Sequence, residues 1–343
     1  MITRRQTLVR LSQLALAATL PAGIIGSRPA RAAGTPLSIG IGGYTFAYLP
    51  LLTAKAAGFL DAQGLDVTLV NANGGTNALA ATLGGSVDVC GLVMSDIILA
   101  AAKGQKIQAF APSMSQYASD AVISVAAAQK AGIVPGMPLK ERMARLKGMA
   151  LAISGRGSGT DKLWRYLLAL GGLDPDKDVT LTVVKLDQMY PALKSGQIDG
   201  FNTTAPANNR AVDDGIAVWV ARPSQGEVPG LEDFLYTVLG AKPDVLADKP
   251  DVIARLVAGL TKGAELVRND PQQAGKVLHE QFFNKTDAAL VVSTVVDQKA
   301  TVAVPPVLTE RQFEQNRDFM MRFGDAVKQV AYQDVMNTKW VKA

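Results

Sequence analysis

Short apolar runs alternate with helical stretches along most of the chain, which is the pattern of an α/β protein. In the first third, the apolar runs predict strands at 37–41, 67–70, 87–92 and 107–111. The stretches between them predict helices at 50–59, 77–83 and 97–103. Because strands that alternate with helices are joined by crossovers, we expect a mainly parallel sheet flanked by helices.

A second set of the same kind follows a polar stretch at 129–138 that contains glycine and proline. The second set predicts strands at 149–153, 180–185, 198–201 and 216–221. It predicts helices at 161–170 and 189–194. Residues 83–88 and 193–199 share a helix end, a glycine and a short buried strand that carries an aspartate, Asp88 or Asp199. This echo indicates two similar lobes.

The last third of the chain is mostly helical and is expected to pack outside the first lobe. Asp270 precedes Pro271, which is the order of an N-cap and a first helical residue. Thr309 with Gln312 forms a capping-box pattern before an amphipathic run at 313–327. We therefore expect lobe 1 to comprise 36–117 and 236–343, and lobe 2 to comprise 118–235. The hinges are expected near 112–122 and 235–240.

The first 32 residues have the order of an export signal. Arg4, Arg5 and Arg10 precede an apolar stretch at 11–25, and small residues flank Arg31. The segment TRRQTL at 3–8 resembles a twin-arginine signal, with an ordinary secretory signal as the alternative. The apolar stretch is too short to span a bilayer. We expect a periplasmic protein, exported and not inserted in the membrane, that begins near Ala33.

The net charge and the few reactive side chains argue against several classes of function. The net charge of +5 lies entirely in the five arginines of residues 1–32, so the remainder is neutral and gives no indication of nucleic-acid binding. Cys90 is the only cysteine and His279 the only histidine. An internal disulfide and a histidine-rich metal site are thereby excluded, and we expect no metal, no cofactor and no histidine-based catalysis.

The loops that follow the predicted strands hold the candidate ligand-binding residues. Ligands of open α/β sheets bind beyond the carboxyl ends of the strands. The candidates are Tyr44, Phe46, Tyr48, Gly75, Thr76, Asn77, Ser95, Arg156, Gly157, Ser158, Gly159, Thr160, Asn202, Thr203 and Thr204.

These loops supply hydrogen-bond donors for a small polar molecule. Glycines let backbone N–H groups approach a ligand, and helix starts favour negative charge. The loop at 154–160 lacks the lysine of a phosphate-binding loop and has Thr160 in place of the third glycine of a dinucleotide fingerprint. The aromatic candidates could instead be core residues, and Arg156 could be solvated. A sulfonate, carboxylate, phosphate or polar heterocycle suits such a site, with an organic anion favoured.

One segment carries a family resemblance. PLLTAKAAGFL at 50–60, followed by GLDV at 64–67, resembles periplasmic binding proteins of the aliphatic sulfonate, taurine, nitrate and thiamine-precursor ABC importers. Gly75, the turn at 85–88 and residues 193–206 follow in the family's order, and the resemblance covers 37–280. It implies a two-lobed periplasmic binding protein fold of type II and delivery of ligand by a monomer to an inner-membrane permease.

Two other functions remain open from the sequence. One is an exported α/β enzyme, for which Asp96 and Asp187 could form a carboxylate pair. The other is a sensory protein that docks on a membrane receptor with its ligand. The enzyme among the family's relatives uses a histidine and a cysteine cluster, which this chain lacks. The sequence therefore predicts a non-enzymatic binder and leaves the ligand unnamed.

Overall fold

The computed structural model describes residues 34–324 and 326–341. The predicted export signal, with its twin-arginine motif, lies outside the described residues. Among the residues that the structure describes, no helix is long and apolar enough to cross a membrane.

The first sheet is formed by strands from two separate parts of the chain, residues 35–114 and 237–241. Its order is β2-β1-β3-β10-β4. The strand bounds are β1 Thr35–Ile41, β2 Leu65–Asn71, β3 Val89–Val93, β4 Gln108–Met114 and β10 Thr237–Ala241. β1 pairs in parallel with β2 and β3, whereas β10 is antiparallel to β3 and β4. β10 is therefore the one antiparallel strand of this sheet.

The second sheet repeats this arrangement with the order β7-β6-β8-β5-β9. The strand bounds are β5 Ser119–Ser124, β6 Ala150–Ile153, β7 Thr180–Val183, β8 Gly200–Thr204 and β9 Ala217–Ala221. β6 pairs in parallel with β7 and β8, and β5 is antiparallel to β8 and β9. The fourth place in each order thus belongs to a strand that runs against its neighbours.

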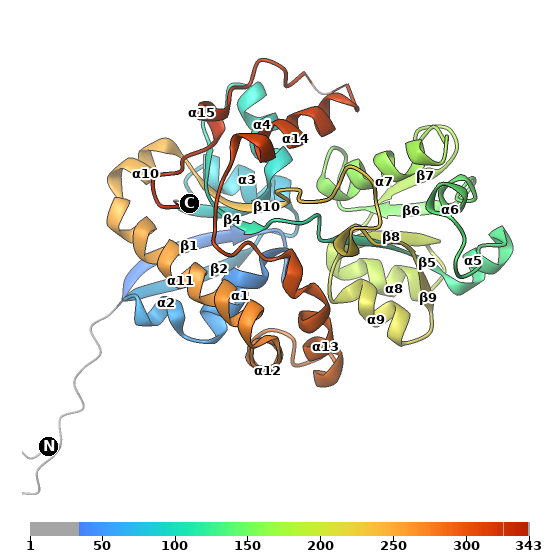
Figure 1. The fold of residues 1–343 in the computed structure, drawn as a ribbon, viewed down its shortest axis with the longest axis horizontal. Helices are drawn as coiled ribbons and strands as arrows, with labels where there is room; N and C mark the ends of the chain where they lie inside the picture. The colour runs from blue at the N-terminus through green and yellow to red at the C-terminus, as the bar shows by residue number, and fades with distance from the viewer. Residues whose placement is uncertain (1–33, 325, 342–343) are drawn as a thin grey trace, which may run out of the picture. The chain divides into compact units, whose positions relative to one another are not determined.

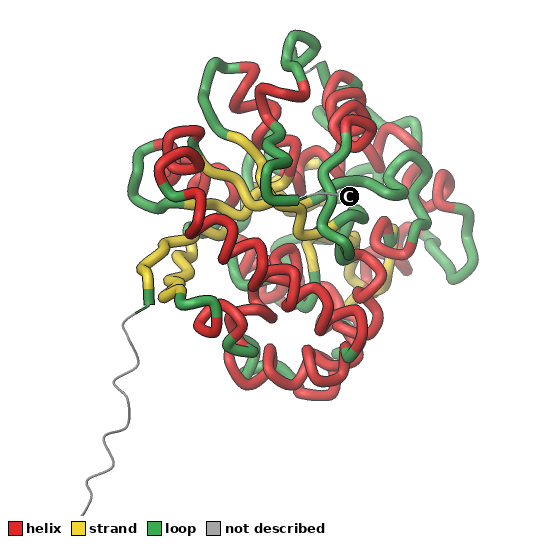
Figure 2. Tube along the Cα trace, turned by 60° about the vertical axis from the view of Figure 1, so that its left-hand side comes forward, coloured by secondary structure: helices red, strands yellow, loops and turns green. Residues whose placement is uncertain are grey.

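The helices of the described residues cover these sheets (Figure 1). The α-helix bounds are α1 Leu49–Ala56, α2 Phe59–Ala62, α3 Gly75–Leu83, α4 Met94–Ala102, α5 Val125–Ala131, α6 Leu139–Ala144, α7 Gly159–Leu170, α8 Met189–Lys194, α9 Ala207–Asp213, α10 Pro243–Asp248, α11 Pro250–Asn269, α12 Pro271–Gln281, α13 Ala288–Gln298, α14 Glu310–Met321 and α15 Tyr332–Val335. The short 3-10 helices are η1 Phe46–Tyr48, η2 Leu186–Gln188, η3 Pro223–Gln225 and η4 Lys299–Thr301. Figure 2 shows the strands enclosed by these helices.

The structure confirms the α/β class and corrects two local predictions. The residues between the strands of the two sheets are 115–118, which lie inside the segment 112–122 expected to be a hinge, and 222–236, which reach the second expected hinge at 235–240. Residues 202–204, expected in a loop, end strand β8. Residues 94–96 open helix α4 rather than a loop. Each correction moves a polar residue from a flexible connection to a buried, regular element.

The sequence echo corresponds to a shared hydrogen-bond arrangement. Asp88 directly precedes β3, and its carboxylate accepts hydrogen bonds of 2.9 Å from the Ser38 amide and 2.7 Å from the Ser38 hydroxyl in β1. Asp199 directly precedes β8 and accepts a 2.8 Å hydrogen bond from the Ala150 amide in β6. The two aspartates therefore have equivalent structural roles in the two sheets. Although burial opposes it, pairing with Lys249 and with Ser38 lowers the pKa of Asp88.

The C-terminal helices contact elements of both sheets. α11 packs on α1 and α2, as expected. However, α13 contacts α9, and Phe319 of α14 stacks with Tyr166 of α7 at a centroid distance of 5.3 Å. The expected cap is present, because the Thr309 side chain and Gln312 form a capping box at the start of α14. The C-terminal segment therefore links the elements of one sheet to those of the other.

A glycine sets the distance between α1 and α11. A Cβ at Gly263 would lie 2.3 Å from the Pro50 carbonyl oxygen and 2.8 Å from the Ala54 amide nitrogen. We therefore expect Gly263→Ala to push the two helices apart and to lower the free energy of unfolding by about 1–3 kcal/mol. Urea unfolding measures the change. Gly84→Ala, whose nearest contact is a helix carbonyl at 3.2 Å, is the control, and an equal loss in both variants would contradict this reading.

Candidate functional site

A small polar cavity of about 70 Å³ lies where loops from the two sheets meet. Its walls are the carboxyl ends of β1, β3, β6 and β8 and the starts of α3 and α7. The lining residues are Gly42, Gly43, Thr45, Ala47, Tyr48, Gly75, Val93, Asp96, Ser154, Ser158, Gly159, Thr160, Leu186, Thr203, Thr204, Tyr236 and Thr237. We call this space the inner cavity.

On the side of the first sheet, two turns approach each other closely. The Gly42 amide donates a 3.2 Å hydrogen bond to the Tyr48 hydroxyl. A Cβ at Gly42 would lie 3.1 Å from the Gly75 amide nitrogen, so a larger residue would separate the turns. Burial raises the pKa of Tyr48 to about 12. The Tyr48 hydroxyl therefore keeps its proton and can donate a hydrogen bond to a ligand.

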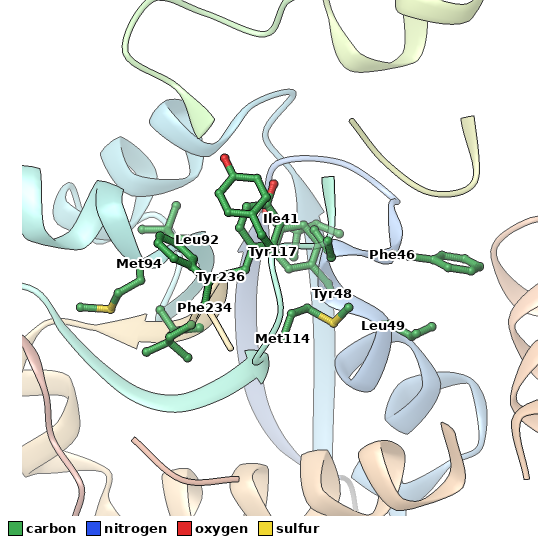
Figure 3. Close-up of a cluster of buried hydrophobic side chains, with 14 of the residues drawn as sticks. Ile41, Phe46, Tyr48, Leu49, Leu92, Met94, Met114, Tyr117, Phe234 and Tyr236 are labelled. Atoms are coloured by element: carbon green, nitrogen blue, oxygen red, sulfur yellow. The ribbon is translucent and has the colours of Figure 1, made fainter. Parts of the chain in front are cut away.

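Tyr48, Tyr117 and Tyr236 belong to one cluster of buried side chains (Figure 3), and Tyr48 and Tyr236 also line the cavity. The rings of Tyr117 and Tyr236 lie 4.4 Å apart between centroids. The Tyr117 hydroxyl donates a 3.2 Å hydrogen bond to the Gly159 carbonyl at the start of α7. The ring of Tyr48 fits here because residue 91 is glycine: a Cβ there would lie 2.6 Å from the ring. Burial raises the pKa of Tyr117 and Tyr236, so both phenols stay neutral.

On the side of the second sheet, three hydroxyls gather at the start of α7. The Ser154 amide donates a 2.8 Å hydrogen bond to the Thr160 hydroxyl oxygen. The Ser158 hydroxyl oxygen lies 3.1 Å from that of Ser154 and 2.9 Å from that of Thr160. The Asn202 side chain donates a 2.8 Å hydrogen bond to the Thr160 carbonyl, which fixes the loop on β8. The hydroxyls are therefore held in position by hydrogen bonds within the protein.

Two helix N-termini border the inner cavity from opposite sides. Gly75 is the first residue of α3 and Gly159 the first residue of α7, and both line the cavity. The first amides of a helix lack intrahelical partners and carry a partial positive charge, which favours an acceptor or an anion. Of the described lining residues, Asp96 alone has a carboxyl group. The cavity can thus hold a ligand that accepts several hydrogen bonds, beside one carboxyl group of the protein.

A second, larger space adjoins the first and shares Gly42, Gly43, Thr45, Leu186 and Thr203 with it. Its volume is about 330 Å³. The remaining lining residues are Tyr44, Asn71, Asn73, Asp187, Tyr190, Pro191, Pro206, Ala207, Arg210, Phe283 and Thr286. We call this space the outer cavity.

The structure brings about half of the candidate residues to these cavities. Those that line the inner cavity are Tyr48, Gly75, Ser158, Gly159, Thr160, Thr203 and Thr204. Tyr44 lines the outer cavity. Those that line neither are Phe46, Thr76, Asn77, Ser95, Arg156, Gly157 and Asn202.

The residues that miss the cavities have other contacts. The ring of Phe46 packs edge-on against Phe283 and points away from the tyrosines (Figure 3). The Asn77 side chain donates to the Ala72 carbonyl at 3.0 Å, and the Gly157 amide donates to Asp161 at 2.6 Å. Arg156 donates to the Leu181 carbonyl at 3.1 Å, so its guanidinium serves the surface of the second sheet.

The remaining candidates are separated by burial. Thr76 is exposed on α3, whereas Ser95 is buried in the first turn of α4. Sequence reasoning also missed Asp96 and Tyr236 as lining residues. Asp96 stands one residue beyond Ser95, and Tyr236 fell in a segment expected to be a hinge. Ser95 and Asp96 are both buried in the first turn of α4, so burial alone does not separate them.

Metal and thiol chemistry find no support in the described part of the chain. No group of three or more His, Cys, Asp or Glu side chains in that part is placed to hold a metal ion. Cys90 lies buried in β3, and burial raises the pKa of its thiol to about 12. The thiol is therefore protonated and unreactive at neutral pH.

Two mixed sheets of identical strand order, with a polar cavity between their loops, define the periplasmic binding protein fold. The alkanesulfonate-binding protein SsuA from Xanthomonas axonopodis pv. citri, solved with MOPS bound, has this fold. It superposes with a TM-score of 0.71 over 90% of this chain and 99% of its own, at 18% identity.

The family is shown by sequence. The model of the NMT1-like family matches residues 31–279, and the chain belongs to that family. The putative binding protein YtlA from Bacillus subtilis is 23% identical over 84% of each chain. The bicarbonate-binding protein CmpA from Synechococcus elongatus is 27% identical over 70% of this chain, which spans 56% of the length of CmpA. The family resemblance stated from residues 50–67 is thereby confirmed.

Proposed function

We propose that this protein is the solute-binding component of an ABC importer, exported to the periplasm, and that it holds a small organic anion or polar heterocycle without converting it. The observation that carries the proposal is the inner cavity, where two helix starts and a set of fixed hydroxyls face each other from different sheets. Such a site offers many neutral donors that bind and release a ligand. The similarity to the alkanesulfonate-binding protein SsuA and the bicarbonate-binding protein CmpA supports this proposal.

The proposed roles follow from position. Gly75, Gly159 and their helix starts would bind the acceptor atoms of the ligand, and Tyr48, Ser158, Thr160, Thr203 and Thr204 would add hydroxyls. The segments 115–118 and 222–236 would act as hinges between a lobe built on the first sheet and a lobe built on the second. Closure would exclude water and strengthen each hydrogen bond. The closed monomer would then be recognised by an inner-membrane permease.

The Phe46 amide already bridges the two sides. It donates a 2.7 Å hydrogen bond to the Ala205 carbonyl, which follows β8. A direct backbone contact across the cavity is what a closed binding protein needs in order to retain its ligand.

Ligand capture can be tested on protein purified from its native host. We expect native mass spectrometry to detect one copy of the chain with one small organic molecule bound, and the same molecule to raise the unfolding temperature of ligand-free protein. Incubation should return the compound unchanged. Chemical conversion of the compound would contradict the proposal in favour of an enzyme. The absence of any stabilising compound among sulfonates, carboxylates and heterocycles would also contradict it.

A further inference from the structure

The two cavities differ in size and in chemistry. The inner cavity of about 70 Å³ has room for a head group of a few atoms, and nine of its seventeen described lining residues carry a hydroxyl group. The outer cavity is more than four times as large, at about 330 Å³. Sites for organic molecules are usually about 300 Å³ or more and lined by apolar and aromatic groups. An inorganic oxyanion would therefore occupy only the smaller space.

Aromatic side chains from elements of both sheets line the outer cavity. Tyr44, 39% exposed, stacks on Phe282 with ring centroids 5.4 Å apart, and Phe283 lines the cavity beside it. Among the elements of the second sheet, the Arg210 guanidinium lies 4.6 Å from the centre of the Tyr190 ring. Tyr190 is also hydrogen-bonded to Asp214, so its ring is held in place. A flat or extended apolar group would find aromatic rings from elements of both sheets.

The shared residues connect the two spaces. Thr45 and Leu186 line both cavities, from the first and the second sheet respectively. A Cβ at Gly43 would lie 3.7 Å from the Leu186 side chain, so the absence of a side chain at Gly43 keeps this junction open on one side. If the head of a ligand lies against the helix starts in the inner cavity, the rest of the ligand can extend past Leu186 into the outer cavity.

From these observations, and on the basis of the proposed binding function, we infer that the ligand is an organic anion with a compact head in the inner cavity and a larger apolar body in the outer cavity. The head accepts hydrogen bonds from the helix starts and the hydroxyls. The body is bounded by Tyr44, Tyr190 and Phe283. Bicarbonate, for which CmpA is named, lacks such a body.

Calorimetric titration with two series of anions tests the inference. The series are methane-, butane- and hexanesulfonate, and acetate, butyrate and hexanoate. Burial of a methylene contributes about 0.8 kcal/mol, so affinity should rise about fourfold for each methylene that enters the outer cavity. Equal affinity along the series that binds would overturn the inference and leave the proposed function standing. If no member of either series bound, the anion-binding function would fail, and this inference with it.

A variant that fills only the outer cavity gives the second readout. Ala207 is the first residue of α9, is half-buried and lines the outer but not the inner cavity. We expect Ala207→Phe to weaken hexanesulfonate or hexanoate at least about fifteenfold, the value of two lost methylenes. The shortest member of the series should change less than about twofold.

The control carries the same substitution at a matched place. Ala126 is the second residue of α5, is exposed and lines neither cavity. Ala126→Phe should leave the affinity of every compound unchanged. Unfolding temperatures of both variants check that they fold. If Ala207→Phe lowered the affinity for short and long anions equally, or changed the affinity for neither, the assignment of the ligand's body to the outer cavity would be wrong.

Discussion

A Gly159→Leu variant is expected to lose at least about a hundredfold in ligand affinity while remaining folded. Gly159 is the first residue of α7, and a Cβ there would lie 3.4 Å from the side chain of Val93 and 3.9 Å from the Tyr236 hydroxyl. A leucine would therefore extend into the inner cavity of about 70 Å³ and take the place of the ligand's head. A hundredfold loss corresponds to about 2.7 kcal/mol, less than the binding energy of a micromolar ligand.

The same loop supplies the control. Gly155 lies four residues earlier, and among the described residues no heavy atom outside its chain neighbours lies within 4 Å of a Cβ placed there. Gly155→Leu should bind the co-purified ligand with unchanged affinity in calorimetric titration. If Gly159→Leu bound as well as the unaltered protein, or if both variants lost affinity equally, the inner cavity would not hold the ligand.

The second large effect concerns stability and pH. Asp120, at the start of β5, is buried and accepts hydrogen bonds from the Ser224 amide at 3.0 Å and the Ser224 hydroxyl at 2.6 Å. Burial raises the pKa of the Asp120 carboxyl to about 6, against the pull of Ser224 and of Arg222, and nearby Asp297 raises it further. In the unfolded chain the pKa returns to about 3.9. The folded protein thus binds the extra proton between about pH 4 and pH 6.

The raised pKa of Asp120 in the folded state determines how stability changes with pH. Because the folded state holds more protons in that range, the contribution of Asp120 to the free energy of unfolding falls as the pH rises from about 4 to about 6. Two units of pKa correspond to about 3 kcal/mol. We expect urea unfolding of Asp120→Asn to lack this fall, so that its stability depends less on pH than that of the unaltered protein.

An exposed carboxyl provides the comparison. Asp66 lies on the surface of β2, and Asp66→Asn should keep the pH dependence of the unaltered protein. Parallel curves for Asp120→Asn and the unaltered protein between pH 4 and pH 7 would show that Asp120 does not titrate in this range.

The sequence predicted most parallel strands and the helices between them, because each strand is a short apolar run bounded by polar or turn-forming residues. It did not predict β5 and β10 as strands. Their apolar runs are as short as the others, but their partners are distant: β10 pairs with β3 and β4, more than a hundred residues earlier. The pattern of apolar residues within a short run indicates that the run is buried, but it does not indicate with which strands the run pairs.

The sequence predicted correctly which loops border the cavities, but not which side chains in those loops line them. The loops at 42–48, 74–77 and 154–160 do border the cavities. Within each loop, however, the direction of a side chain depends on one turn of backbone. Thr76 faces solvent beside Gly75, which lines the inner cavity, and Arg156 reaches the Leu181 carbonyl while Ser158 lines the cavity. Periodicity does not resolve neighbours in an irregular segment.

The position of β10 between β3 and β4 has a consequence for how the molecule is made. A nascent chain that has reached residue 236 contains all of the second sheet, yet the first sheet still has a gap at its fourth place. The first sheet therefore cannot be completed until residues 237–241 have been synthesised. A fragment that ended at residue 236 would contain β3 and β4 but not the strand that pairs with both. The first sheet is therefore completed only after the whole second sheet has been synthesised.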